Sequence, residues 1–326
     1  MAWYLGIDTS NYTTSAALFE PQTNRMLSVR KLLTVSQGKM GLKQSDAVFA
    51  HVKQLPSLLE QVMQQGNSPR IAAVGASVRP RDQEGSYMPC FLVGELCGVS
   101  AAQGAGVVLH RFSHQCGHIA AALYGAGQLQ LRHQPFIAFH VSGGTTECLL
   151  VEPSQRPGIP FSVQIVAQSL DLKAGQAIDR VGGMLGLPFP AGRYLDELSC
   201  RCEKTFHIRP TMKGMDCCLS GIENQCRKLV DMGTSPQEVA KYCITSVEAA
   251  VDAMTAAVRQ QYGNLPLLYA GGVMSNTQIQ RELSQKYHAY FAPAAYSADN
   301  ACGIAVLTAL AAGERLNEKG GALCED

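Results

Sequence analysis

The fold is indicated first by the stretch WYLGIDTSNYTTSAALF, residues 3–19. Residues 3–8 and 15–19 are apolar runs of strand length, and the polar residues 9–14 between them predict a hairpin with hydroxyl groups at its bend. A very similar pattern, FIAFHVSGGTTECLLV, returns at residues 136–151. The use of one hairpin unit twice predicts an internally duplicated protein.

Both hairpin turns are rich in small and hydroxyl-bearing residues. Ser142, Gly143 and Gly144 form the bend of the second hairpin, where glycine lets backbone N–H groups turn toward a bound anion. The two turns therefore suggest a ligand that carries phosphate. The alternative is an ordinary hairpin turn, which favours the same residue types.

Helices are expected between the strands. Periodicity and start signals predict them at residues 45–65, 91–103, 174–185, 193–202, 219–232 and 236–262, the last four in an insertion after the second hairpin. Short apolar runs predict strands at 71–78, 107–109 and 267–270. The last strand ends in Gly271-Gly272 before another helix, an arrangement that lets a nucleotide approach the backbone closely.

Composition narrows the class of protein. The chain has 326 residues, of which 46% are hydrophobic and 16% charged, and its net charge is +1. These values predict a compact protein of about two domains and argue against disorder, and against a protein that coats nucleic acid through a strongly basic surface. The sequence shows no signal peptide or membrane span, and its 12 cysteines include no CxxC pair, so reduced thiols, a cytoplasmic location and no membrane partner are expected.

Two histidines, His114 and His118, are four residues apart on a predicted helix. This spacing turns both imidazoles to one side of the helix, which suits a divalent metal, but further ligands must come from elsewhere in the chain. Asp299 lies at the start of the last predicted helix, about 297–312, and is a candidate ligand that would also suit a helix N-cap. The alternative is that the histidines are ordinary surface or core residues.

Eight segments follow one another in an informative order: 6–10 (GIDTS), 114–118 (HxxGH), 141–144 (VSGG), 174–181 (AGQAIDRV), 185–192 (LGLPFPAG), 219–222 (LSGI), 271–276 (GGVxxN) and 298–300 (ADN). In this order the chain resembles the TsaD family, the tRNA threonylcarbamoyladenosine synthase subunits once called glycoproteases, over nearly its whole length. The resemblance implies an α/β protein of the actin-like, sugar kinase and Hsp70 (ASKHA) superfold, with two duplicated ribonuclease-H-like lobes and a helical insertion. The first lobe would cover residues 1–110 and be completed by the C-terminal helix, about 297–326; the second would cover 111–296, with the insertion at 171–262.

The resemblance also implies a site. One divalent metal, iron or zinc rather than magnesium, would be held by His114, His118 and Asp299. The adenosine of an adenylate, ATP or ADP would contact Asp179, Gly192, Asp196 and Asn276. The phosphate side of this ligand would be lined by Ser142, Gly143 and Gly144. The catalytic candidates are Asp8, Thr13 and Ser142.

The implied activity is transfer of a threonylcarbamoyl or related acyl group from an adenylate to the N6 amine of a tRNA adenosine. Thr13 stands where the resemblance predicts a glutamate, Cys116 replaces a glutamate of the histidine motif, and residues 79–81 read RPR in place of GPG. An open alternative is therefore a divergent paralogue: a nucleotide-binding regulatory subunit that pairs with itself or with a related lobe-duplicated protein, or a carbamoyl-type transferase with a non-tRNA acceptor. A zincin-like protease is disfavoured because no glutamate lies between the histidines, and a sugar kinase or ATPase would leave the histidine pair unexplained.

Overall fold

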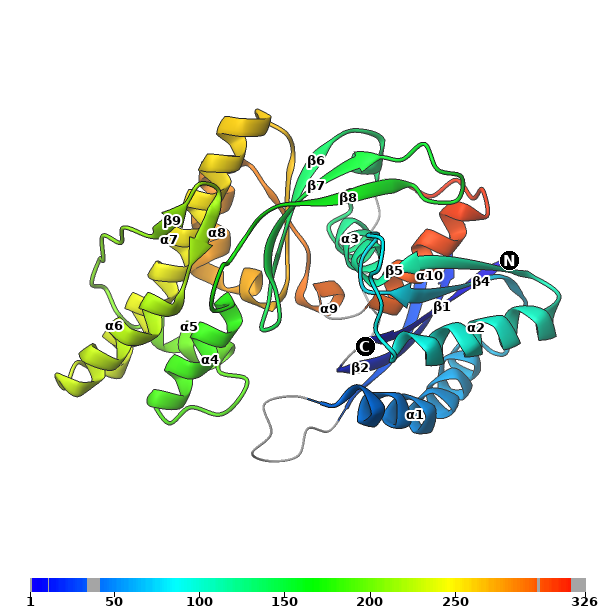
Figure 1. Ribbon diagram of the computed structural model, residues 1–326, viewed down its shortest axis with the longest axis horizontal. Coiled ribbons are helices and arrows are strands. Elements are labelled where there is room, and N and C mark those ends of the chain that lie inside the picture. The colour runs from blue at the N-terminus through cyan, green and yellow to red at the C-terminus, as the bar shows by residue number, and fades with distance from the viewer. Residues whose placement is uncertain (1, 11, 34–41, 298–299, 318–326) are drawn as a thin grey trace. The chain divides into compact units, whose positions relative to one another are not determined.

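The computed structural model describes residues 2–10, 12–33, 42–297 and 300–317. In these ranges the chain forms two five-stranded sheets with helices and divides into two compact units (Figure 1). Unit 1 comprises Met1–Gln134, Glu152–Val163 and Ala295–Asp326, and unit 2 comprises Pro135–Val151 and Gln164–Ala294. Among the described helices, none is both long enough and apolar enough to cross a membrane.

The sheet of unit 1 has the strand order β3-β2-β1-β4-β5. β1 (Trp3–Ser10), β2 (Thr13–Glu20) and β3 (Arg25–Leu32) are antiparallel neighbours, and β4 (Ile71–Arg79) and β5 (Val108–Ser113) continue the sheet in parallel. β1 and β2 are buried along nearly their whole length, as their continuous apolar sequence predicts. The first predicted hairpin is confirmed, with each strand reaching two residues farther into the turn.

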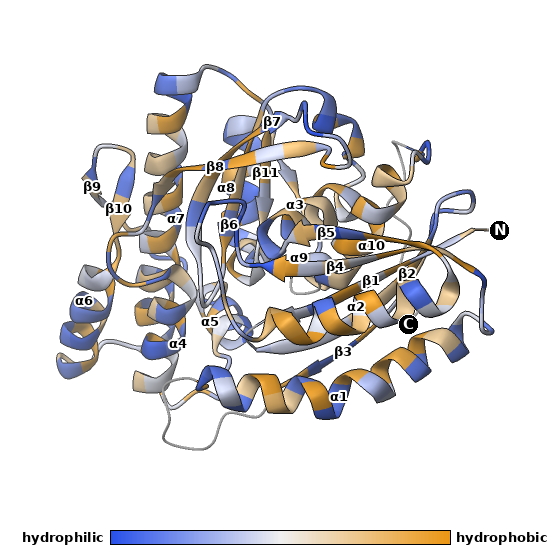
Figure 2. Cartoon of the chain, turned by 45° about the vertical axis from the view of Figure 1, so that its right-hand side comes forward, coloured by the Kyte–Doolittle hydropathy of each residue, from blue (hydrophilic) through white to orange (hydrophobic). Residues whose placement is uncertain are grey.

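Helices cover both faces of this sheet. Ile7 of β1 packs in one core cluster with Leu55 of α1 (Gln44–Gln65) and Val93 of α2 (Phe91–Ala105). Gly6, the preceding residue, faces the opposite side, where α10 (Asn300–Ala311) lies against it. Figure 2 shows apolar and polar residues alternating along α1, which buries one face only, whereas α10 is apolar and buried through nearly all its length.

The helix that carries the two histidines is α3 (His114–Gly125), and it packs directly against α10. The two backbones are so close that a Cβ atom on Gly303 would lie 1.8 Å from the carbonyl oxygen of Gly117. Only glycine fits at this crossing, because any side chain would have to force the helices apart. The short 3-10 helix η1 (Leu129–His133) follows α3.

The sheet of unit 2 has the strand order β12-β11-β6-β7-β8. β6 (Phe136–Val141) and β7 (Thr146–Pro153) form an antiparallel hairpin, β8 (Phe161–Gln168) lies beside β7, and β11 (Leu267–Ala270) and β12 (Tyr290–Phe291) run parallel to β6. When the five strands of each unit are counted in chain order, both sheets have the third, second, first, fourth and fifth strand side by side in that order. Each strand of unit 2 therefore occupies the place of its counterpart in unit 1. The internal duplication predicted from the two hairpins is therefore confirmed.

The helices of unit 2 surround one core. α4 (Ala174–Met184), α5 (Gly192–Ser199), α6 (Ser220–Asp231) and α7 (Pro236–Tyr262) follow the predicted helices to within a few residues, and α8 (Thr277–Tyr287) is the helix expected after the glycine pair. Val247 and Val251 of α7 are buried among them. A small hairpin, β9 (Thr211–Lys213) and β10 (Asp216–Cys218), precedes α6. The short helices η2 (Gly272–Ser275) and α9 (Ala294–Ser297) complete the described elements.

Two features differ from expectation. The strands β3, β8, β9, β10 and β12 were not predicted, because each of them is polar on one side or very short. The lobe boundary expected after residue 110 falls inside β5, and residues 111–134 belong to unit 1, since α3 packs on α10 and extends the layer that covers the first sheet.

Candidate functional site

Asp8, a predicted catalytic residue near the end of β1, is fully buried in unit 1. Its Oδ1 accepts a hydrogen bond from Nδ1 of His114 at 3.0 Å and another from the hydroxyl of Ser77 on β4. Burial acts to raise the pKa of Asp8, but the interactions with His114 and Ser77 outweigh it, so this pKa lies below its ordinary value. An ionised carboxylate can only accept hydrogen bonds, so the proton of the Asp8–His114 contact is on Nδ1 of His114.

The two histidines are neighbours on α3, which begins at His114. Ser113 caps the helix, because its Oγ accepts a hydrogen bond from the backbone N–H of Cys116 at 3.2 Å. The ring centroids of His114 and His118 are 4.5 Å apart, with 72° between the ring planes. The imidazoles thus lie together, as their four-residue spacing predicts.

The residues around this pair suit a metal. A metal-binding histidine commonly donates its other ring N–H to a carboxylate, and Nδ1 of His114 has such a partner in Asp8. Oδ2 of Asp8 is buried and has no hydrogen-bond partner among the described residues. Asp299, the predicted third ligand, lies outside the described residues, and within those that are described no three His, Cys, Asp or Glu side chains are grouped to hold a metal ion.

Cys116 lies between the two histidines and is buried. Its thiol donates a hydrogen bond to Oδ2 of Asp82 at 2.9 Å. Burial and the negative charge of Asp82 raise the pKa of Cys116 far above its ordinary value. In this arrangement the thiol of Cys116 is a hydrogen-bond donor to Asp82.

Thr13, the second catalytic candidate, begins β2 opposite Ser10 of β1. Side chains alternate along a strand, so Thr13, Ser10 and Asp8 lie on the same face of the hairpin. The Ser10 hydroxyl donates to the backbone oxygen of Thr13 at 3.5 Å. This face of the hairpin thus presents hydroxyl groups beside the Asp8 carboxylate.

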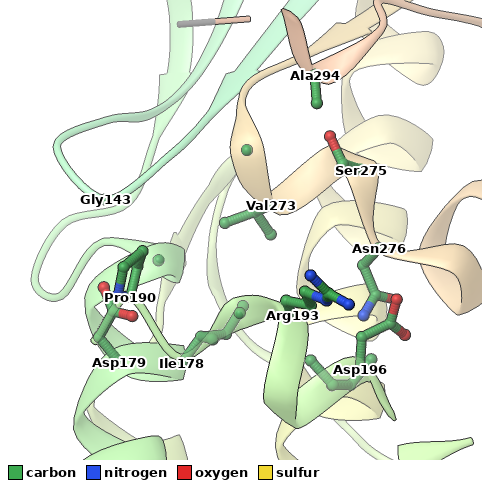
Figure 3. A pocket seen from close by; sticks show the side chains of 14 residues that line it. Gly143, Ile178, Asp179, Pro190, Arg193, Asp196, Val273, Ser275, Asn276 and Ala294 are labelled. Atoms are coloured by element: carbon green, nitrogen blue, oxygen red, sulfur yellow. The ribbon is translucent and has the colours of Figure 1, made fainter. Parts of the chain in front are cut away.

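A cavity of about 480 Å³ lies within unit 2 (Figure 3). Its wall is formed by the turn after β6, by α4 and α5, and by the segment that joins β11 to α8. Five residues predicted to bind a nucleotide line it: Gly143, Asp179, Gly192, Asp196 and Asn276. The structure therefore brings together residues from separate parts of the sequence.

Asn276 offers this cavity an oriented hydrogen-bond donor. Its Oδ1 caps α8 by accepting from the backbone N–H of Ile279 at 3.1 Å, which fixes the side-chain amide. Nδ2 of Asn276 is buried without a partner among the described residues, as is Oγ of the adjacent Ser275. Buried polar atoms are normally satisfied, so both atoms are candidates to bond a ligand or water.

The two aspartates of the cavity differ in their bonding. Asp196 lies below Asn276 in Figure 3, and its carboxylate accepts from the backbone N–H of Thr277 at 3.2 Å and from the Thr277 hydroxyl at 3.1 Å. Asp196 thus holds the start of α8 in place. Asp179, beside Pro190, accepts from the backbone N–H of Ala191 at 2.8 Å through Oδ1, and burial raises its pKa.

The residues of the second hairpin turn, 142–144, have different roles. Gly143 lines the cavity, whereas Ser142 shapes the turn: its Oγ accepts from the backbone N–H of Thr145 at 3.2 Å, and its carbonyl oxygen accepts from the N–H of Gly175 at 3.1 Å. Gly144 is not among the lining residues. Gly271, which precedes the lining residue Gly272, has a positive φ of 104°, and a Cβ there would lie 2.1 Å from the carbonyl oxygen of Val141.

Some residues of these sites were not predicted. Ser77 was predicted only as part of a buried strand. Its lone hydroxyl in an apolar run was the signal that could have indicated a polar partner, which is Asp8. Ser275 and Arg193 also line the cavity. Nothing in their local sequence marks them, because the shape of the cavity depends on distant segments.

Comparison with known proteins places these sites in context. The family model described as tRNA N6-adenosine threonylcarbamoyltransferase (TsaD) matches residues 31–306. Proteins of that name from Corynebacterium aurimucosum and Thermus thermophilus are 29% identical over 298 residues and 27% identical over 315 residues. The first match covers 85% of this chain and 81% of the relative, and the second covers 93% and 91%.

Solved structures show the same fold at lower identity. HypF in its phosphate- and nucleotide-bound form is 12% identical with a TM-score of 0.58, covering 95% of this chain and 55% of that one. Component A of the Acidaminococcus fermentans (R)-2-hydroxyglutaryl-CoA dehydratase is 15% identical with a TM-score of 0.55, covering 96% and 100%. A ROK family glucokinase from Streptomyces griseus is 11% identical with a TM-score of 0.53, covering 96% and 100%. The ASKHA fold expected from the sequence is therefore confirmed, and because the family model spans most of its length, this chain belongs to the TsaD family of tRNA N6-adenosine threonylcarbamoyltransferases.

Proposed function

We propose that this protein transfers a threonylcarbamoyl or related carbamoyl group from an adenylate to the N6 amine of a tRNA adenosine. Beyond family membership, one observation carries the proposal: three helices begin at the cavity of unit 2. Gly175 lies in the first turn of α4, Gly192 begins α5, and Asn276 caps α8. The N–H groups of Gly175, Thr277 and Ile279 are already hydrogen-bonded within unit 2, so it is the partial positive charge of the helix N-termini that favours a ligand that carries phosphate.

The side chains of this cavity suit a nucleoside attached to that phosphate. Nδ2 of Asn276 can donate to an acceptor on the ligand, and this donor is already desolvated. Oδ1 of Asp179 is occupied by Ala191, so Oδ2 is left for a ribose hydroxyl. Gly143, Gly192 and Gly272 let the backbone approach the phosphate without side chains in between. The ligand proposed for unit 2 is thus an adenylate, with ATP or ADP as its analogues.

In unit 1 the His114–His118 pair would hold a divalent metal, iron or zinc, together with Asp299. When bound, such a metal supplies Lewis-acid polarisation and positive charge for a carbonyl or phosphate oxygen. Asp8 orients His114 through Nδ1 and stabilises positive charge on the pair. Ser77 holds Asp8 in turn.

The transfer forms a bond between the carbamoyl carbon and the amine nitrogen and breaks the bond from that carbon to a phosphate oxygen. AMP leaves, and the amine loses a proton. The hydroxyl of Thr13 is too weakly basic at neutral pH to take this proton as a general base would. Thr13 can instead hydrogen-bond the amine or the carbonyl, and the proton passes to solvent or to the departing phosphate.

The proposal can be tested with the purified full-length protein, unmodified tRNA, ATP, threonine, bicarbonate and a threonylcarbamoyl-adenylate synthase. Mass spectrometry of the tRNA nucleosides should detect modified adenosine with wild type. His114→Ala and Asn276→Ala should abolish or strongly reduce the product, and His110→Ala, which removes an imidazole on β5 outside the pair, should not. Absence of product with wild type, under conditions in which a known family member modifies the tRNA, would contradict the proposal.

A second candidate is favoured by the hairpin of unit 1, where Thr13 supplies a hydroxyl and no carboxylate. The protein would then bind a nucleotide as a regulatory subunit, alone or paired with a related lobe-duplicated protein, or would serve a non-tRNA acceptor. Nucleotide binding that requires Asn276 but yields no modified tRNA would support this candidate.

A further inference from the structure

The segment that follows β4 is tied to the start of the histidine helix. The backbone N–H of Gln115 donates to the carbonyl oxygen of Pro80 at 3.0 Å. Next to this contact lies Asp82, whose side chain is only 12% exposed. Asp82 is thus a carboxylate held near the His114–His118 pair without being part of it.

Asp82 uses its two oxygens on two different elements. Oδ1 accepts from Nε and Nη2 of Arg79 at 3.0 and 2.5 Å, which joins Asp82 to the end of β4. Oδ2 accepts from the Ser113 hydroxyl at 3.1 Å and from the Cys116 thiol at 2.9 Å, which joins it to the first turn of α3. One carboxylate therefore links a strand end to a helix start.

The link to Ser113 also sets the helix cap. A serine hydroxyl has one proton, and Ser113 gives that proton to Asp82, so its lone pairs face the N–H of Cys116. Ser113 and Cys116 stand on either side of His114 in the sequence, and both are anchored to the same oxygen. The first turn of α3 therefore cannot rotate without breaking hydrogen bonds in a largely buried setting, and this rotation is what would move Nδ1 of His114 away from Asp8.

We propose that Asp82 is a positioning residue, which holds the first turn of α3 so that His114 meets Asp8 and the His114–His118 pair is turned toward a divalent metal. This inference rests on the metal site of the proposed function. Asp82 touches neither metal nor substrate in this arrangement. It acts through Ser113 and Cys116.

The test uses metal-stripped full-length protein and zinc, with affinity measured by competition against a chelator and Tm measured in parallel. Asp82→Ala should weaken zinc binding by about tenfold or more, the range found when residues that support metal ligands are removed. Cys116→Ser keeps a donor to Asp82 and should bind zinc like wild type. Glu20→Gln is the matched control, because Glu20 is a buried carboxylate of the same unit that accepts from Gln22 and Thr23. It should lower Tm without changing zinc affinity.

A second readout needs no metal. In 15N spectra of metal-free protein the His114 imidazole should carry its proton on Nδ1 in wild type, and Asp82→Ala should shift it toward a mixture of the two tautomers. Asp82→Asn keeps the volume if the alanine variant does not fold. The inference is overturned if both Asp82 variants fold and leave the tautomer and the zinc affinity within twofold of wild type. If wild type binds no zinc or cobalt, the metal part of the proposed function fails, while the tautomer measurement still decides the role of Asp82.

Discussion

Replacing Asn276 by serine should separate ligand binding from helix capping. Serine caps helices about as well as asparagine, so the start of α8 should be preserved, whereas the buried, unpartnered Nδ2 donor of Asn276 is lost. A ligand acceptor buried against this position would then be unsatisfied, which costs about 1–3 kcal/mol. This cost corresponds to a Kd for ATP, ADP or AMP that is roughly 5- to 150-fold higher, with little change in Tm.

Two further variants make the experiment decisive. Asn276→Ala removes both donor and cap, so it should show the same loss of affinity and, in addition, lose about 1 kcal/mol of stability. Ser235→Ala removes the cap of α7, where Ser235 accepts from Glu238, and should lose stability without losing affinity. Isothermal titration calorimetry and differential scanning calorimetry give the two quantities. If Asn276→Ser binds nucleotide as tightly as wild type, the side-chain amide does not contact the ligand and the nucleotide assignment of the cavity is wrong.

Three other perturbations have definite expected outcomes. Asp8→Asn should weaken zinc binding by about 10- to 100-fold, measured by chelator competition, because an amide supports the His114 ring without the negative charge. Burial raises the pKa of Asp179, so the folded state binds this proton more tightly than the unfolded state does. The stability that this proton contributes is complete below the ordinary pKa of 3.8 and is lost as the pH rises through the raised pKa. Asp179→Asn should therefore have a higher Tm than wild type at pH 7, and a Tm difference that does not shrink as the pH is lowered toward 3.8 would contradict this. Gly303→Ala should lower the free energy of unfolding in urea by about 1–3 kcal/mol or prevent folding, since its Cβ would lie 1.8 Å from the carbonyl oxygen of Gly117; unchanged stability would show that α3 and α10 do not cross so closely.

Local sequence patterns were sufficient for most elements but not for the sites. Helix α7, residues 236–262, was predicted at its observed bounds because it has a capping serine, proline in its first turn and a long periodic pattern. β3 was missed because Arg25, Arg30 and Lys31 interrupt its apolar residues, as is usual for a strand at the edge of a sheet.

The sites depend on contacts that no local pattern records. The Asp8–His114 hydrogen bond joins residues 106 positions apart, so only the fold could reveal which carboxylate orients the histidine. The cavity residues of unit 2 were grouped in advance through family resemblance, since a lone aspartate such as Asp179 or Asp196 has no signal of its own. Only the hydrogen-bond geometry distinguishes their roles: Asp179 keeps one carboxylate oxygen for a ligand, whereas Asp196 is bonded to Thr277.

The duplicated fold explains how one architecture could supply two kinds of site. β1 of unit 1 corresponds to β6 of unit 2, and β4 corresponds to β11, because each pair holds the same place in its sheet. Ligands of α/β proteins gather beyond the carboxyl ends of parallel strands. In unit 1 these ends carry Asp8 and Ser77, which orient a histidine, whereas in unit 2 they lead into Gly143 and Gly272, which expose backbone to a cavity. In the proposed function, polar side chains at one pair of strand ends would help to hold a cation and glycines at the other would admit a phosphate, so the two copies of one topology would carry complementary chemistry.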